Sequence, residues 1–145
     1  MTAKSIKKTV SGLLPDPFAA AEALGITVLF LELPDCTKGI CYEVQNHKII
    51  ILSNTLSKGE ARYFCAHELG HAVLHPELNY SFLMSRTLFE PKKFEREADI
   101  FAAELLISDD ALCSPELKNM SSAQIASLLC LPEKLILLKT NTLEP

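Results

Sequence analysis

The fold is decided by one stretch of the sequence, Ala61-Arg-Tyr-Phe-Cys-Ala-His67-Glu68-Leu-Gly-His71-Ala-Val-Leu-His75. It contains the pattern His-Glu-x-x-His. Residues four apart on an α-helix lie on the same side, so His67 and His71 would present two imidazoles together. Two imidazoles at this spacing are suited to bind one zinc ion. Glu68 would lie beside the metal rather than bind it, and its carboxylate could accept a proton from a metal-bound water.

The residues around this pattern also predict a helix. Ser57 is expected to cap its start, with Glu60 as a capping-box partner, and Pro76 is expected to end it. With about 100° between successive residues, polar and apolar residues separate onto opposite sides. We therefore expect a buried helix with a metal-binding front. The front is formed by Phe64, His67, Glu68, His71 and His75, and the back by Ala66, Leu69 and Val73.

An alternative is that the histidines make ordinary hydrogen bonds on a helix surface or in a core, since short motifs also occur by chance. However, the chain has only four histidines, and three of them fall within nine residues on one face. The fourth, His47, begins a predicted strand and is expected to be a solvated strand-end residue. This concentration of imidazoles favours the metal site.

The composition indicates one folded globular domain. The chain has 145 residues, of which 48% are hydrophobic and 22% are charged, and this is enough to bury a core. Its formal charge of −4 provides no basic field for DNA or RNA, so direct nucleic-acid binding is disfavoured. We expect residues 1–14 to be flexible and residues 111–145 to form a helical C-terminal extension of the same domain.

The sequence also favours a cytoplasmic protein without a membrane anchor. No apolar run approaches the length of a membrane span, and the first ten residues lack the apolar segment of a secretory leader. The five cysteines are irregularly spaced, which fits free thiols in a reducing compartment better than a disulfide framework or a second zinc site. Cys65 and Cys130 fall in apolar helical patterns and are expected to pack as small hydrophobes.

Short strands and helices are predicted on both sides of the metal-binding helix. Asp16 should cap a short helix that begins at Pro17 and is closed by Gly25. Three runs, the first of them β-branched and apolar, then predict a small sheet, with a tight turn at Gln45-Asn46. The predicted strands are 26–33, 39–44 and 47–52, and the predicted later helices are 92–107, 122–130 and 132–139. The expected fold is α+β and zincin-like, a three-stranded sheet packed on a buried zinc helix and followed by further helices.

A third metal ligand is needed, because catalytic zinc sites keep three protein ligands and one water. In the helix after residue 91, Glu95 and Asp99 lie one turn apart on a face that is otherwise apolar. Buried carboxylates need partners, because an unpaired buried charge is costly. We therefore assign Glu95 to the metal and expect Asp99 to accept a ring N–H from one of the histidines. The alternative is a solvated charged surface, which is the environment we expect for Arg96 and Glu97.

His75 is a rival for the third position, because it faces the same way as His71. It lies roughly 12 Å along the helix axis from His67, at about 1.5 Å per residue. Coordination of one ion by three histidines of one rigid helix would therefore be awkward. We expect His75 to cap the helix C-terminus or to support a ligand by a hydrogen bond.

These motifs resemble those of the ImmA/IrrE family of zinc metallopeptidases. The resemblance lies in Ala66-His-Glu-Leu-Gly-His71-Ala-Val-Leu-His75 and Glu95-Arg-Glu-Ala-Asp-Ile-Phe-Ala-Ala-Glu-Leu-Leu106, with support from Leu24-Gly-Ile-Thr-Val and the strands between Gly39 and Leu52. It implies a gluzincin-like fold, with a set of roles for five residues. These are His67, His71 and Glu95 as zinc ligands, Glu68 as general base, and Asp99 as a hydrogen-bond partner of a metal-binding histidine.

The resemblance also implies a protein partner, because family members cleave helix-turn-helix repressors and so relieve repression, often in mobile elements or stress responses. The sequence departs from the family in two places. Members often continue with Met-Pro after the Leu-Leu pair, where this chain has Ile107-Ser108. Some members also carry a DNA-binding domain, for which we expect no room in this chain. A repressor substrate would then be a separate chain.

The expected reaction is hydrolysis of a peptide bond, in which zinc polarises the scissile carbonyl and Glu68 transfers a proton to the leaving amine. Tyr80 and Arg86 are candidates to stabilise the oxyanion, and the connection 77–90 is interpreted as a lid or cleft wall. Two alternatives stay open: a zinc-containing module that inactivates a repressor without proteolysis, and a site that has lost catalysis. Glu68 argues against both, because a structural zinc site does not need a base.

Overall fold

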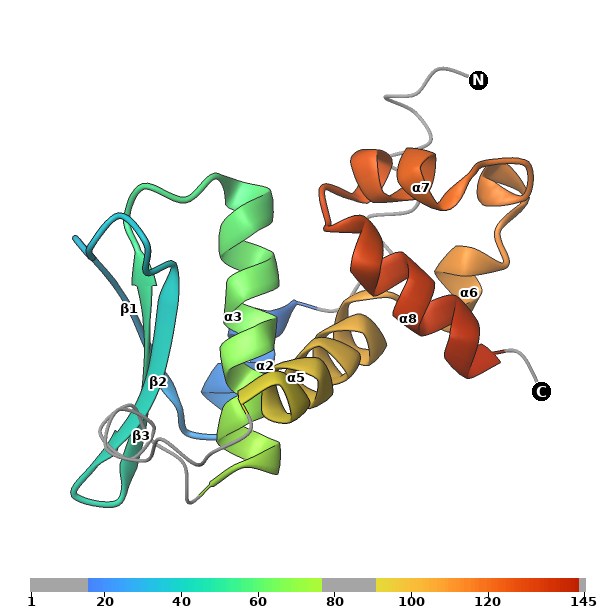
Figure 1. Ribbon diagram of the computed structural model, residues 1–145. Helices are drawn as coiled ribbons and strands as arrows, with labels where there is room; N and C mark the ends of the chain where they lie inside the picture. Colours follow the sequence, from blue (N-terminus) through green and yellow to red (C-terminus); the bar gives the residue numbers. More distant parts are fainter. Residues whose placement is uncertain (1–15, 77–90, 144–145) are drawn as a thin grey trace.

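The computed structural model describes residues 16–76 and 91–143. It has the expected α+β class, with one small sheet followed by helices (Figure 1). In chain order the elements are α2 (Pro17–Ala23), β1 (Thr27–Leu31), β2 (Gly39–Val44), β3 (His47–Ser53), α3 (Lys58–Leu74), α5 (Pro91–Leu106), α6 (Asp109–Leu112), the 3-10 helix η1 (Pro115–Leu117), α7 (Ser122–Leu129) and α8 (Glu133–Leu143). Within the described ranges, no helix is long and apolar enough to cross a membrane.

The sheet has the strand order β1-β3-β2, so β1 and β2 form its two edges. β2 runs antiparallel to β3, and β1 runs parallel to it. The β2–β3 turn has positive φ at Gln45 and Asn46, 50° and 64°, as the predicted tight hairpin turn requires. β1 is shorter than the predicted strand 26–33, because its partner ends at Ser53, which is paired with Leu31.

The first helix has the predicted caps. The Asp16 side chain accepts a hydrogen bond from the backbone N–H of Phe18, at 2.9 Å, and Pro17 occupies the first turn. Gly25 has a φ of 74°, the left-handed region in which glycine carries no steric penalty. The chain can therefore reverse directly from α2 into β1.

α3 is the central helix, and it lies between the sheet and α5 (Figure 1). Ser57 and Glu60 form the predicted capping box, with hydrogen bonds of 3.2 and 3.0 Å to each other's backbone N–H. The helix ends at Leu74, one residue before the cap His75. Val73 differs from the expected buried back of the helix, because it is 44% exposed.

Two hydrophobic cores meet at α3. One lies between the sheet, α2 and α3, and includes Ile50, Leu52 and Leu69. The other lies between α3, α5 and the C-terminal helices, and includes Leu106, Leu135 and Ile136. Phe64 and Leu105 contact both clusters. The facing surfaces of α3 and α5 are therefore supported from both sides.

The C-terminal helices differ from the prediction in their ends. α5 stops at Leu106, and Ser108 then accepts a hydrogen bond from the N–H of Ala111 to cap α6, at 3.1 Å. The expected packing of Cys130 is wrong: it is exposed and has a φ of 59° at the end of α7. α8 continues to Leu143, beyond the predicted residue 139. Buried Lys139 attaches α8 to α5 through Glu104, at 2.8 Å.

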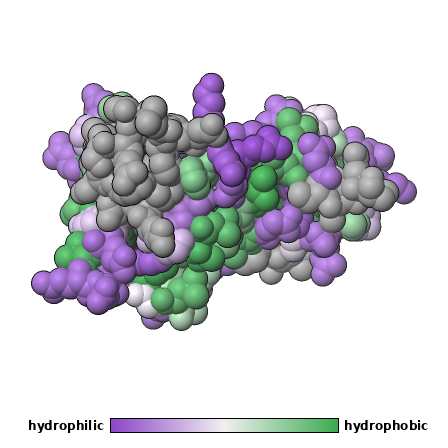
Figure 2. All heavy atoms as spheres, turned by 60° about the horizontal axis from the view of Figure 1, so that its bottom comes forward, coloured by the Kyte–Doolittle hydropathy of each residue, from purple (hydrophilic) through white to green (hydrophobic). Residues whose placement is uncertain are grey.

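Hydrophobic residues also reach the surface. Figure 2 turns the bottom of Figure 1 toward the reader and shows hydrophobic residues across the middle of this face. The exposed large hydrophobic residues include Leu24, Val73 and Leu74, which come from the ends of α2 and α3.

Candidate metal centre

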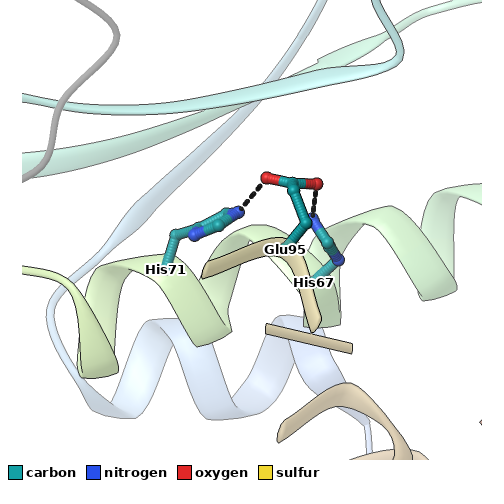
Figure 3. A group of neighbouring side chains, drawn as sticks. All are labelled: His67, His71 and Glu95. Atoms are coloured by element: carbon teal, nitrogen blue, oxygen red, sulfur yellow. Dashed lines mark hydrogen bonds and ion pairs between the residues drawn. The ribbon is translucent and has the colours of Figure 1, made fainter. Parts of the chain in front are cut away.

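Three side chains from two helices converge on one point (Figure 3). His67 and His71 come from α3 and Glu95 from α5. One ligand atom from each residue lies within 4.8 Å of the others. Nε2 of His67 lies 2.9 Å from one oxygen of Glu95, and Nε2 of His71 lies 2.8 Å from the other. The structure thus brings together the three residues that were expected to bind the metal.

Helix packing explains why Glu95 reaches the two histidines. Gly70 lies between them on α3 and lets the backbone of α5 come close. A Cβ atom at Gly70 would lie only 3.1 Å from the Cα and carbonyl oxygen of Ala98, which is tighter than ordinary packing allows. The small residues Gly70 and Ala98 therefore set the separation of the helices at the level of the site.

Asp99 lies behind His67, as expected. Its Oδ1 accepts hydrogen bonds from Nδ1 of His67, at 2.8 Å, and from the hydroxyl of Tyr63, at 2.7 Å. Its Oδ2 lies 3.0 Å from Nζ of Lys134 on α8. Sequence reasoning missed both additional partners. Tyr63 carries a usable signal, because it precedes His67 by one helical turn; Lys134 carries none, because it comes from a distant helix.

His75 has both roles that were expected of it. Its backbone N–H donates to the carbonyl of His71 and caps α3, while its ring contacts the ring of His71, with 3.0 Å between the two Nδ1 atoms. Glu97 keeps part of the expected solvent exposure, with 38% of its side chain accessible, but its Oε2 also lies 2.8 Å from Nε2 of His75, a contact that was not expected. Glu97 and Glu95 point to different sides of α5. His75 lies one turn beyond His71 on α3 and contacts the side of α5 that carries Glu97.

Glu68 lies beside the three-residue group and is only 8% exposed. Its side chain lies below the first residue of β2: a Cβ atom at Gly39 would be 3.3 Å from Cγ of Glu68. Burial raises the pKa of Glu68 above its ordinary value, against the opposing effect of His67 and His71. Among residues 16–76 and 91–143, its carboxylate has no hydrogen-bond partner.

The electrostatics of the group reflect strong pairing between imidazole and carboxylate. Burial opposes protonation of His67, but its hydrogen bonds to Asp99 and Glu95 outweigh this and raise its pKa to about 9. The same hydrogen bonds from His67 and His71 lower the pKa of Glu95. Burial raises the pKa of Asp99, but hydrogen bonds from His67, Tyr63 and Lys134 lower it further than burial raises it.

The donor set fits a zinc ion. Two imidazole nitrogens and one carboxylate are the ligands of a common class of catalytic zinc site, which leaves a coordination position open. The carboxylate oxygens of Glu95 face both Nε2 atoms, and both Nδ1 atoms are hydrogen-bonded on the far side. This orientation leaves Nε2 of each ring for the metal. In the described part of the chain, this is the one cluster of three or more potential ligands.

Other predicted residues lie elsewhere. Tyr80, Arg86 and the rest of the connection 77–90 fall outside the described residues. His47 is exposed at the start of β3, where its Nε2 lies 2.6 Å from the hydroxyl of Thr27. It belongs to the sheet edge, as expected, and not to the metal group. All five cysteines are free.

Comparison with known proteins agrees with this geometry. The sequence matches the IrrE N-terminal-like domain, a peptidase family, over residues 21–141. It is 34% identical over 124 residues to uncharacterized immunity region protein 2 of Bacillus phage phi105, and the aligned region covers 86% of this chain and 78% of that protein. It is also 34% identical over 73 residues to metallopeptidase ImmA of Bacillus subtilis strain 168, and the aligned region covers 49% of this chain and 43% of ImmA.

Proposed function

The chain belongs to the IrrE N-terminal-like family of peptidases, and from this membership we propose that it is a zinc-dependent metalloendopeptidase whose substrate is a helix-turn-helix transcriptional repressor. The repressor would be a separate chain, and its cleavage would relieve repression. The proposal rests on the position of Glu68, a buried carboxylate without a described hydrogen-bond partner beside two histidines and a glutamate that can hold one metal ion.

His67, His71 and Glu95 would hold the zinc ion. When bound, zinc would polarise a scissile carbonyl and lower the pKa of a coordinated water to about 7. Glu68 would accept the proton of the attacking water and deliver it to the leaving amine. The burial of Glu68 supports this role, because a raised carboxyl pKa brings the group closer to the neutral range in which it can both accept and release a proton.

The sheet offers a place for the substrate. β2 is an edge strand, and its first residue, Gly39, lies directly over Glu68. The outer edge of β2 pairs with no other strand among residues 16–76 and 91–143, and an extended peptide that added to it would form main-chain hydrogen bonds. Such a peptide would cross the molecule next to the catalytic carboxylate. This arrangement favours an endopeptidase, because neither end of the substrate has to be enclosed.

The proposed partner is supported by the relatives. One is named for an immunity region of a phage and another is named a metallopeptidase, which fits regulation of a repressor in a mobile element. The alternative is a zinc-containing protein that inactivates the repressor by binding alone. A binding module has no need for a buried proton acceptor beside its metal, so Glu68 favours the peptidase.

The decisive experiment compares wild type with Glu68→Gln. The variant keeps the shape of the side chain but removes its basic carboxylate, so zinc content should be unchanged while cleavage falls by about 10²–10⁴-fold. The protein is mixed with zinc and a candidate helix-turn-helix repressor, and cleavage is followed on a gel. Glu22→Gln, on the exposed surface of α2, is the matched control and should cleave normally. Relief of repression by both proteins with the repressor intact would support the binding module instead.

A further inference from the structure

His71 is connected to α5 by two hydrogen bonds in series, through His75. Nδ1 of His71 lies 3.0 Å from Nδ1 of His75, and Nε2 of His75 lies 2.8 Å from Oε2 of Glu97. His75 is 5% exposed. Its ring packs edge to face against the ring of Phe94, with 4.5 Å between the two ring centroids. The ring is therefore held in one orientation, with each nitrogen facing one partner.

The positions of the protons in this series follow from the acceptor at its end. An ionised carboxylate can only accept hydrogen bonds, so Nε2 of His75 has to carry the proton that faces Glu97. In a neutral imidazole the other nitrogen is then an acceptor. Nδ1 of His75 therefore accepts from Nδ1–H of His71. A neutral His71 with its proton on Nδ1 has its lone pair on Nε2, and a metal ion bound between this nitrogen and Glu95 would replace the hydrogen bond seen there.

We propose that Glu97, acting through His75, is a positioning residue that fixes the tautomer of His71 with the Nε2 lone pair directed at the metal. The inference rests on the proposed metal site but not on peptidase activity. It assigns a role to a residue pair that lies outside the ligand set. Hydrogen bonds behind metal-binding histidines fix the ring and its tautomer, and their loss typically weakens metal binding by about 10–100-fold.

The two ligand histidines are thus supported by α5 in different ways. Asp99 accepts directly from Nδ1 of His67, whereas Glu97 acts on His71 through an intervening ring. The difference follows from the helix geometry, because His71 lies one turn further along α3. His75 occupies the following turn and bridges the remaining distance to α5.

A substitution series at Glu97 tests the proposal through zinc affinity, measured by competition with a chromophoric chelator. Glu97→Gln keeps an oxygen acceptor and should bind zinc within a few-fold of wild type. Glu97→Leu removes the acceptor and should bind about 10–100-fold more weakly. Glu97→Lys places a donor against Nε2 of His75. The direction of both hydrogen bonds is then reversed, and the proton of His71 moves to Nε2. This variant should bind most weakly of the three.

His75→Gln provides the control for the added charge. Its amide oxygen can accept from His71 without help from residue 97, so zinc affinity should stay near that of wild type. In this background, Glu97→Lys should lose most of its effect. If Glu97→Lys weakened zinc binding equally with His75 or Gln at position 75, simple charge repulsion would explain the result and the proposal would be wrong.

The tautomers can also be observed directly in the metal-free protein, by long-range proton–nitrogen correlation spectra of ¹⁵N-labelled histidine rings. We expect His75 to carry its proton on Nε2 in wild type and on Nδ1 in Glu97→Lys. A wild-type His75 with its proton on Nδ1 would overturn the proposal. Absence of cleavage by a zinc-loaded protein with the expected tautomers would refute the peptidase function and leave this inference standing.

Discussion

Glu95 and Glu97 are two residues apart on α5, and both reach α3 at different histidines. Glu95→Ala removes a carboxylate whose oxygens face both Nε2 atoms, so we expect the purified protein to lose stoichiometric zinc. Glu97→Ala removes only the acceptor behind His75, so zinc should still bind, about 10–100-fold more weakly. Metal analysis after dialysis against a series of free zinc concentrations measures both. Zinc retained by Glu95→Ala but lost from Glu97→Ala would contradict the ligand assignment.

The charges at the site also predict how the stability of the metal-free protein depends on pH. The pKa of His67 is raised from 6.5 to about 9, so its stabilising effect is complete below pH 6.5 and is lost as the pH rises to about 9. The pKa of Glu95 is lowered from 4.5, so its effect is present above pH 4.5 and is lost on further acidification. The site should therefore stabilise the metal-free protein most between these two pH values.

Thermal unfolding across this range, in chelator, provides the measurement. The melting temperature of the metal-free wild type should fall between pH 6.5 and 9, and that of His67→Gln should fall less. Zinc-loaded protein should show the opposite trend, because bound imidazoles have to be deprotonated. A melting temperature of metal-free wild type that rose with pH in parallel with the zinc-loaded protein would contradict the assigned pairing.

At this scale, sequence reasoning succeeded where a contact repeats with the helical period. His67 and His71 are four residues apart, as are Glu95 and Asp99, and the structure brings all four together. It missed the contact between Glu97 and His75, because this contact depends on where α3 ends relative to α5. Helix crossing is set by packing of distant small residues such as Gly70 and Ala98, which the local period does not contain.

At the scale of the elements, Gly39 allows β2 to pack closely against the side chain of Glu68, the proposed base. A Cβ atom at Gly39 would lie 3.1 Å from Cδ2 of Leu52 and 3.3 Å from Cγ of Glu68. Gly39→Ala should therefore displace Glu68 by a few tenths of an ångström or more and destabilise the fold by about 1 kcal/mol or more. Because the metal ligands are not displaced, we expect zinc content to stay the same and cleavage of the repressor to fall by at least about 10-fold.

The control for Gly39→Ala is Ile40→Ala on the same strand. Successive residues of a strand face opposite sides of the sheet, so this change removes side-chain bulk on the side away from Glu68. It should lower the melting temperature without selectively lowering kcat. Equal loss of kcat in the two variants, at equal stability, would show that β2 acts on catalysis only through the stability of the sheet.

Element boundaries were predicted well where a cap is encoded locally. Ser57 and Glu60 begin α3 with the predicted capping box, and α7 begins at the predicted Ser122. The ends of β1 and α8 were predicted less well. β1 stops with its partner strand, and α8 continues past Lys139, which is buried against Glu104 and Asp109 of other helices. Such limits depend on tertiary neighbours rather than on local residues.

At the scale of the whole molecule, the proposed metal joins two helices that separate two hydrophobic cores. α3 contributes to both cores, and α5 contacts it along the same face that carries Glu95. Asp99 extends this connection to the C-terminal helices through Lys134. Zinc bound between α3 and α5 would therefore stabilise the packing of both cores together.

This position predicts that zinc removal lowers the stability of the whole fold. A ligand that binds only the native state, at about 100 times its dissociation constant, stabilises it by about 2.7 kcal/mol. For a chain of this size, that corresponds to a rise in melting temperature of roughly 5–10 °C. We expect one zinc per chain and a chelator-induced fall of this size for wild type in a single unfolding transition. His67→Ala and His71→Ala should contain no stoichiometric zinc, and their melting temperatures should not respond to chelator. If wild type held no metal and its melting were equally insensitive to chelator, these residues would be an ordinary hydrogen-bonded cluster, and the metal centre would be wrong.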